Sequence, residues 1–109
     1  MSRTVVVRYK TRPEAAEENQ RLVERVFAEL HEKDPGGTRY ATFRLADGVT
    51  FIHVSVTEGE VSPVTTTAAF AEFQRGVDGR CVELPVLTEA TVVGSYPGLP
   101  ARAAAAAGE

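Results

Sequence analysis

Tryptophan is absent from this sequence, and cysteine occurs once, at Cys81. A single cysteine excludes a disulfide within the chain, so we expect a cytoplasmic protein. Two histidines and one cysteine are too few for a dedicated zinc site, and the sequence has no phosphate-binding glycine loop and no HExxH motif. We therefore expect neither a metal nor any other cofactor.

Long apolar runs and an excess of positive charge are also missing. No stretch approaches the ~20 apolar residues that span a bilayer, and the N-terminus lacks the apolar core of a signal peptide. The chain carries 12 Lys and Arg against 15 Asp and Glu, with no basic stripe. We therefore expect no membrane and no nucleic acid among its partners.

What is present is the composition of one ordinary globular domain. The chain has 109 residues, of which 43% are hydrophobic and 25% charged. We assign the domain to residues 1–96 and expect a flexible tail, rich in alanine and proline, over 97–109. The patterns within the domain predict strands at 3–10, 38–46, 49–57 and 88–96, helices at 12–33 and 66–78, and a connector with Pro85 at 79–87.

Two short motifs define the first half of the chain. Thr11 and Glu14 have the spacing of a capping box for the first helix. Asp47-Gly48 predicts a two-residue type I′ turn, which would pair Thr42 with His53. This register separates an aliphatic face, which we expect beneath the helices, from a mixed face, which we expect to point away from them. The aliphatic face holds Ala41, Phe43, Leu45, Ile52, Val54 and Val56, and the mixed face holds Tyr40, Thr42, Arg44, Phe51, His53 and Ser55.

The predicted order β-α-β-β-α-β is the split βαβ pattern of ferredoxin-like α+β folds. Right-handed crossovers place both helices on one face of a four-stranded antiparallel sheet. The opposite face would be too apolar to remain bare, so we expect a homodimer through that sheet face.

The chain resembles the dimeric α+β barrel superfamily and, within it, the antibiotic-biosynthesis-monooxygenase-like group. The resemblance covers residues 3–96 and is carried by Val5-Val6-Val7-Arg8-Tyr9, Tyr40-Ala41-Thr42-Phe43-Arg44 and Ala69-Phe70-Ala71-Glu72-Phe73. It implies that two subunits join their sheets into a barrel, with ligands bound between helices and sheet. The group includes cofactor-free quinone-forming oxygenases, haem-degrading enzymes and proteins without an assigned activity. The lack of tryptophan departs from the active-site pattern of the first two.

His53 and Asn19 are the candidate catalytic residues. His53 would act as an acid or base near neutral pH, or simply form hydrogen bonds at the subunit interface. Asn19 is a polar residue on the apolar stripe of the first helix. It would polarise a bound carbonyl or dioxygen species, or reach water at the edge of the stripe. We expect the two on opposite sides of the sheet, and therefore not in one site.

Five further residues are candidates for ligand binding. Arg8, Tyr40 and Arg44 are expected to share a face with His53, where they would hold an anionic or phenolic ligand or form salt bridges, with Glu89 as one partner. Phe70 and Phe73 would wall an aromatic ligand or simply fill the core.

Two functions follow from these expectations. The first is a cofactor-independent monooxygenase-like protein acting on an aromatic or polyketide-type small molecule. The alternative is a non-catalytic ligand-binding or stress-response barrel, in which the helix–sheet space is filled by side chains. A cavity of ~300 Å³ or more with convergent polar groups would oppose the second.

Overall fold

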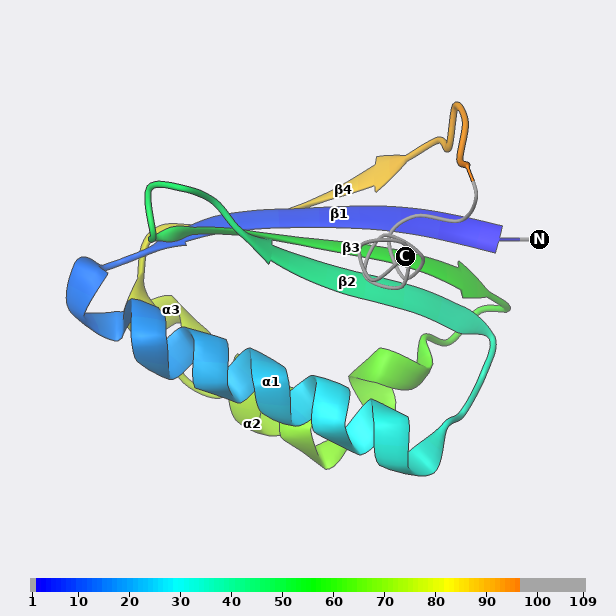
Figure 1. Cartoon of the computed structure of the whole chain (residues 1–109), viewed down its shortest axis with the longest axis horizontal. Helices are drawn as coiled ribbons and strands as arrows, with labels where there is room; N and C mark the ends of the chain where they lie inside the picture. Colours follow the sequence, from blue (N-terminus) through cyan, green and yellow to red (C-terminus); the bar gives the residue numbers. More distant parts are fainter. Residues whose placement is uncertain (1, 97–109) are drawn as a thin grey trace.

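The computed structural model describes residues 2–96 and confirms the predicted fold class. A four-stranded antiparallel sheet, in the order β2-β3-β1-β4, carries all the helices on one face (Figure 1). The predicted tail over 97–109 lies outside the described residues. No helix of the described chain is long and apolar enough to cross a membrane. The elements are β1 (Ser2–Thr11), η1 (Pro13–Ala15), α1 (Ala16–Lys33), β2 (Thr38–Arg44), β3 (Thr50–Glu58), η2 (Pro63–Thr66), α2 (Ala68–Gln74), α3 (Val77–Arg80) and β4 (Cys81–Ala90).

The start of the first helix differs from the prediction. The 3₁₀ turn η1 precedes α1, and the predicted capping box is not formed. Thr11 ends β1 instead, where its backbone N–H donates to the Val49 carbonyl at 2.8 Å. The Glu14 carboxylate accepts from Arg12 at 2.7 Å. The helix ends as predicted, at Lys33.

The hairpin between β2 and β3 has the predicted register, which pairs Thr42 with His53. Its turn is not the predicted type I′ turn, because of the two central residues only Gly48 takes a positive φ, of 80°. A type I′ turn needs positive φ at both central residues. The Asp47 carboxylate instead accepts from the backbone N–H groups of Val49 and Thr50, at 2.9 Å each, and this stabilises a wider loop.

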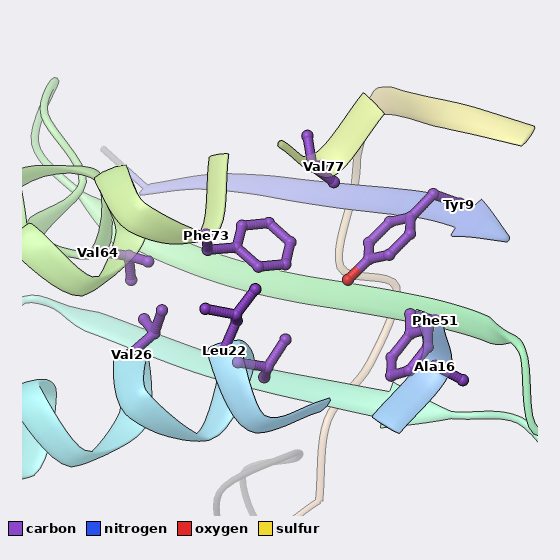
Figure 2. Close-up of a cluster of buried hydrophobic side chains, with 9 residues drawn as sticks. Tyr9, Ala16, Leu22, Val26, Phe51, Val64, Phe73 and Val77 are labelled. Atoms are coloured by element: carbon purple, nitrogen blue, oxygen red, sulfur yellow. The ribbon is translucent and has the colours of Figure 1, made fainter. Parts of the chain in front are cut away.

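The assignment of the two sheet faces was wrong, because the mixed face is the one beneath the helices. Tyr9, Phe51 and His53 are buried there, whereas Phe43 on the aliphatic face is 44% exposed. Large rings fill the helix–sheet space. The ring centroids of Tyr9 and Phe51 lie 5.5 Å apart, and Figure 2 shows both among the core side chains. Polar atoms on this face hydrogen-bond to one another, so burying them costs little.

The C-terminal half also departs from the predicted boundaries. Gly76, with φ of 111°, interrupts the second helix and divides it into α2 and α3. β4 occupies most of the predicted connector and ends before most of the predicted last strand. Pro85 is tolerated because β4 is an edge strand and Pro85 lies at a bulge between the pairings of Arg8 and Lys10.

Candidate functional site

A cavity of about 300 Å³ lies between the helix-facing side of the sheet and the segment that contains η2 and α2. Most of its wall is apolar, and a few polar side chains from β1, β2 and β3 converge on it. Phe70 and Phe73 line it as predicted, and Phe73 also belongs to the buried core. Its lining includes Val5, Val7, Tyr9, Tyr40, His53, Ser55, Thr57, Val64, Phe70, Phe73 and Leu87.

A chain of hydrogen bonds, buried except for its part-buried last link, runs from α3 to the cavity wall. Arg80 Nε donates to Asn19 Oδ1 at 3.0 Å, and Asn19 Nδ2 donates to the Tyr9 hydroxyl at 2.8 Å. The Tyr9 hydroxyl lies 2.8 Å from Nε2 of His53, and Nδ1 of His53 lies 2.5 Å from the Tyr40 hydroxyl. In Figure 2 the Tyr9 hydroxyl points into the space between Phe73 and Phe51. The chain therefore links an interior cation to the cavity.

Alternation along the strands brings these groups together. Tyr9 on β1 faces Phe51 on β3, and His53 faces Thr42 on β2, so the side chains point to the same side of the sheet. Asn19 reaches them from the apolar stripe of α1. The ring of Tyr40 is held by Phe27 of α1, at 4.8 Å between centroids. Rigid elements thus position every member of the chain.

Burial keeps the titratable members of this site neutral. It lowers the pKa of His53 to about 4 and raises the pKa of Tyr40 to about 12. Burial also raises the pKa of Tyr9 well above its usual value, although the hydrogen bond from Asn19 opposes this. Near pH 7 the site therefore presents a neutral imidazole and two un-ionised phenols.

Arg80 supplies the positive charge of this buried region. Its side chain is buried, with 6% of the residue exposed, and within residues 2–96 it forms no ion pair with a carboxylate. Its guanidinium donates to the Phe73 carbonyl at 2.9 Å and lies 5.1 Å from the centroid of the Phe73 ring. An interior cation without a counter-ion creates a potential that favours negative charge nearby.

The structure brings His53 and Asn19 together, so the expectation that they lie on opposite sides of the sheet was wrong. Both side chains lie on the helix side, joined through Tyr9. Asn19 is fully buried and does not line the cavity. Its amide therefore acts on the cavity through Tyr9.

The two predicted arginines lie away from the cavity. Arg8 pairs with Ile52 and so occupies the opposite face of the sheet from His53, which contradicts the expected grouping. Its guanidinium lies 3.8 Å from Glu83. Arg44 lies on the helix side, but it bonds to Glu17 at 2.9 Å and does not line the cavity. Arg3, not Arg8, pairs with Glu89.

Two members of the site, Tyr9 and Arg80, were absent from the predicted set. The alternation of Val5, Val7 and Tyr9 would have placed Tyr9 beside His53 once β1 was paired with β3. Arg80 lies in a segment with no recognisable pattern, and its burial depends on the break at Gly76. Within the described residues, no group of three His, Cys, Asp or Glu side chains could hold a metal ion.

Comparison with known proteins gives the fold and no closer relationship. No protein-family model matches the chain, and a search of curated proteins finds no match. Solved structures do match. Rv0793 from Mycobacterium tuberculosis has a TM-score of 0.71 and 15% identity, covering 88% of this chain and 99% of its own. A proposed antibiotic biosynthesis monooxygenase from Nitrosomonas europaea has a TM-score of 0.70 and 15% identity, covering 88% and 92%.

A third similar structure has a described activity. It is a variant of SnoaB, a cofactor-independent oxygenase from Streptomyces nogalater, with a TM-score of 0.64 and 16% identity over 89% of this chain and 98% of its own. These likenesses confirm the resemblance at the level of fold. The chain has the ferredoxin-like fold of the antibiotic-biosynthesis-monooxygenase-like group.

Proposed function

We propose that the cavity binds a small aromatic molecule and that the chain is a cofactor-independent monooxygenase acting on aromatic or polyketide-type substrates. The observation that carries this proposal is the cavity of about 300 Å³, with Tyr9, His53 and Tyr40 converging on one part of an otherwise largely apolar wall. This size is at the lower end of small-molecule sites. The similarity in fold to a cofactor-independent oxygenase is further support.

The reaction that suits this wall is oxidation of an activated methylene group by dioxygen. A CH₂ group flanked by aromatic rings and opposite a ring carbonyl loses a proton, and the carbonyl oxygen becomes an enolate. Reaction with one O₂ then converts CH₂ to C=O and releases one water. The apolar wall would hold the rings, and the hydrogen-bonded Tyr40 would contact the oxygen on which charge develops.

His53 has a supporting role in this proposal. A pKa of about 4 makes its neutral imidazole a weak proton acceptor at pH 7. Both ring nitrogens already have partners, Tyr9 at Nε2 and Tyr40 and Thr42 at Nδ1. We therefore assign to His53 the positioning of Tyr40, and the substrate proton passes to water.

The second candidate function is ligand binding without turnover. The observation that favours it is the same occupancy of both His53 nitrogens, which leaves no free base beside Tyr9 and Tyr40. The Glu60 carboxylate, which also lines the cavity, belongs to an exposed residue of the segment between β3 and η2. Oxygen consumption separates the two. With anthrone as substrate, the oxygenase consumes one O₂ for each anthraquinone formed, at a rate above the uncatalysed oxidation and unchanged by a chelator. Binding of anthrone with no rate above that background would establish the second function.

We also propose a homodimer through the aliphatic sheet face. This face, and not the mixed face, is uncovered in a single chain: Phe43 and Val86 are exposed, and Ile52 and Val54 are half-buried. A second copy pairing the same face would remove these side chains from water. The cavity lies on the other side of the sheet and would stay open to ligands.

A further inference from the structure

We infer that the ligand of this cavity presents an oxygen acceptor, a carbonyl or an oxyanion, to the Tyr40 hydroxyl, because Arg80 fixes the direction of the whole hydrogen-bond chain. The inference rests on the proposed location of the ligand, but it does not require that the ligand be oxidised. It selects aromatic ketones, enolates and phenolates over ring systems without oxygen and over cationic amines.

The fixed end of the chain is Arg80, since a guanidinium can only donate hydrogen bonds. Its Nε contact therefore identifies the oxygen of the Asn19 amide and turns the NH₂ group toward Tyr9. The Tyr9 oxygen accepts from this NH₂ group. The orientation of the Asn19 amide group is therefore determined by its contact with Arg80.

The next link fixes the hydrogen on His53. Tyr9 is 2% exposed, and its own hydroxyl hydrogen has one partner among the described side chains, Nε2 of His53, at 2.8 Å. Nε2 must therefore accept. A neutral imidazole carries one hydrogen, which then resides on Nδ1.

The last link faces the cavity. Nδ1–H donates to the Tyr40 oxygen at 2.5 Å, with Thr42 Oγ1 as a second acceptor at 3.1 Å. The Thr42 hydroxyl also hydrogen-bonds to Tyr40 and can donate to its oxygen, so the Tyr40 hydroxyl hydrogen remains available to a ligand. Tyr40 lines the cavity, whereas Thr42 lines the separate groove between α1 and β2. The chain of donors therefore ends in an O–H group offered to the ligand.

Charge reinforces this choice. Arg80 is the buried cation of the site and lacks a carboxylate partner within residues 2–96. Its potential favours a ligand oxygen that carries negative charge, and aligned donors strengthen one another. A ligand oxygen that accepts hydrogen bonds is therefore favoured at this end of the cavity over a protonated aromatic amine.

The first test concerns the unliganded full chain. In ¹⁵N-labelled protein that carries His31→Gln, so that one histidine signal remains, the ring-nitrogen shifts of His53 report its tautomer. We expect the hydrogen on Nδ1. A hydrogen on Nε2 would reverse the last links, turn the Tyr40 hydrogen toward His53 and overturn the inference.

The second test uses matched probes, 9-fluorenone and fluorene, which share a ring system and differ by the carbonyl. We expect fluorenone to bind more tightly and its carbonyl stretch to shift to lower frequency when bound. Tyr40→Phe keeps the ring stacked on Phe27. It should weaken the binding of fluorenone about fivefold to tenfold, abolish the shift of its carbonyl stretch and leave the binding of fluorene unchanged.

These results separate the inference from the proposed function. Fluorenone preference without oxidation of anthrone supports the inference and overturns the proposed oxygenase. Equal binding of the two probes, or equal weakening of both by Tyr40→Phe, overturns the inference even if anthrone is oxidised. Binding of neither probe overturns both.

Discussion

The hydroxyl of Tyr9 and Nε2 of His53 lie 2.8 Å apart in the space between the sheet and the helices. Tyr9 comes from β1 and His53 from β3. Among the described side chains, the Tyr9 hydroxyl has one other hydrogen-bond partner, Asn19, and Nε2 of His53 has no other. This contact joins the interior polar groups to the cavity. Stability and ligand preference should therefore respond to the same substitutions.

Tyr9→Phe should destabilise the protein although it removes a single oxygen atom. The ring would keep its stack on Phe51, but the Asn19 amide and the His53 ring would each lose a buried partner. Buried groups left without a hydrogen bond cost about 1–3 kcal/mol each. We expect the free energy of unfolding in urea to fall by about 2–4 kcal/mol.

The matched control is Tyr96→Phe, which makes the same chemical change at a side chain that is 91% exposed. Its free energy of unfolding should stay within about 0.5 kcal/mol of the parent value. If both variants unfold at the same urea concentration, the hydrogen bonds of Tyr9 contribute nothing measurable to stability.

Stability should fall between pH 7 and pH 5 because of His53. Burial lowers its folded pKa to about 4, whereas the unfolded chain binds a proton near pH 6.5. As the pH drops, the unfolded state gains a proton that the folded state does not, so unfolding becomes easier. The loss should be about 2 kcal/mol over this range.

The comparison for this prediction is His53→Gln, whose stability should lack that part of the pH slope whatever its absolute value. In the His31→Gln background, the remaining histidine resonance should titrate near pH 4. Titration near pH 6.5, or an unchanged slope in His53→Gln, would show that His53 is solvated and not enclosed beneath the helices.

The order of elements and the strand register could be predicted from the sequence because both depend on local signals. Asp47-Gly48 marks the hairpin, and the periodicity around Leu22 and Val26 marks α1. The orientation of the sheet could not be predicted, since it depends on which face the helices cover. Counting aliphatic residues favoured the wrong face, because tyrosine and histidine become compatible with burial only when their polar atoms meet.

The candidate site could be predicted only in part. His53, Tyr40, Phe70 and Phe73 could be selected by residue type, and all four line the cavity. Arg80 could not be selected, because its burial arises from the turn at Gly76 and from partners distant in the sequence. A chain of hydrogen bonds across several elements has no signature in any one of them.

Asn19→Asp should reverse the hydrogen bonds that lead to the cavity. The new carboxylate would accept from Arg80 and also from the Tyr9 hydroxyl, so the Tyr9 oxygen would turn its lone pair toward His53. We expect the His53 hydrogen to move from Nδ1 to Nε2 and fluorenone to bind more weakly. The ¹⁵N shifts of the imidazole ring measure the first effect.

Gln20→Glu is the control for Asn19→Asp, because it makes the same change of charge one residue further along α1. Its side chain bonds to Arg44 and Glu24 and does not touch the buried chain. The His53 tautomer should remain that of the parent protein. A parent-like tautomer in Asn19→Asp itself would show that Arg80 does not set the direction of these bonds.

Phe43→Asp should convert the proposed dimer to a single chain. Phe43 is 44% exposed on the aliphatic sheet face, so pairing two copies would bury it, and an aspartate there would be desolvated in both subunits without a partner. Sedimentation at micromolar concentration should give twice the mass of one chain for the parent and the mass of one chain for the variant.

The control for Phe43→Asp is Val61→Asp, which makes a comparable change at a residue that is 67% exposed in the loop before η2. This variant should remain dimeric. A parent protein that sediments as one chain would leave the aliphatic face without its proposed partner, while the cavity on the other side of the sheet could still be tested with fluorenone.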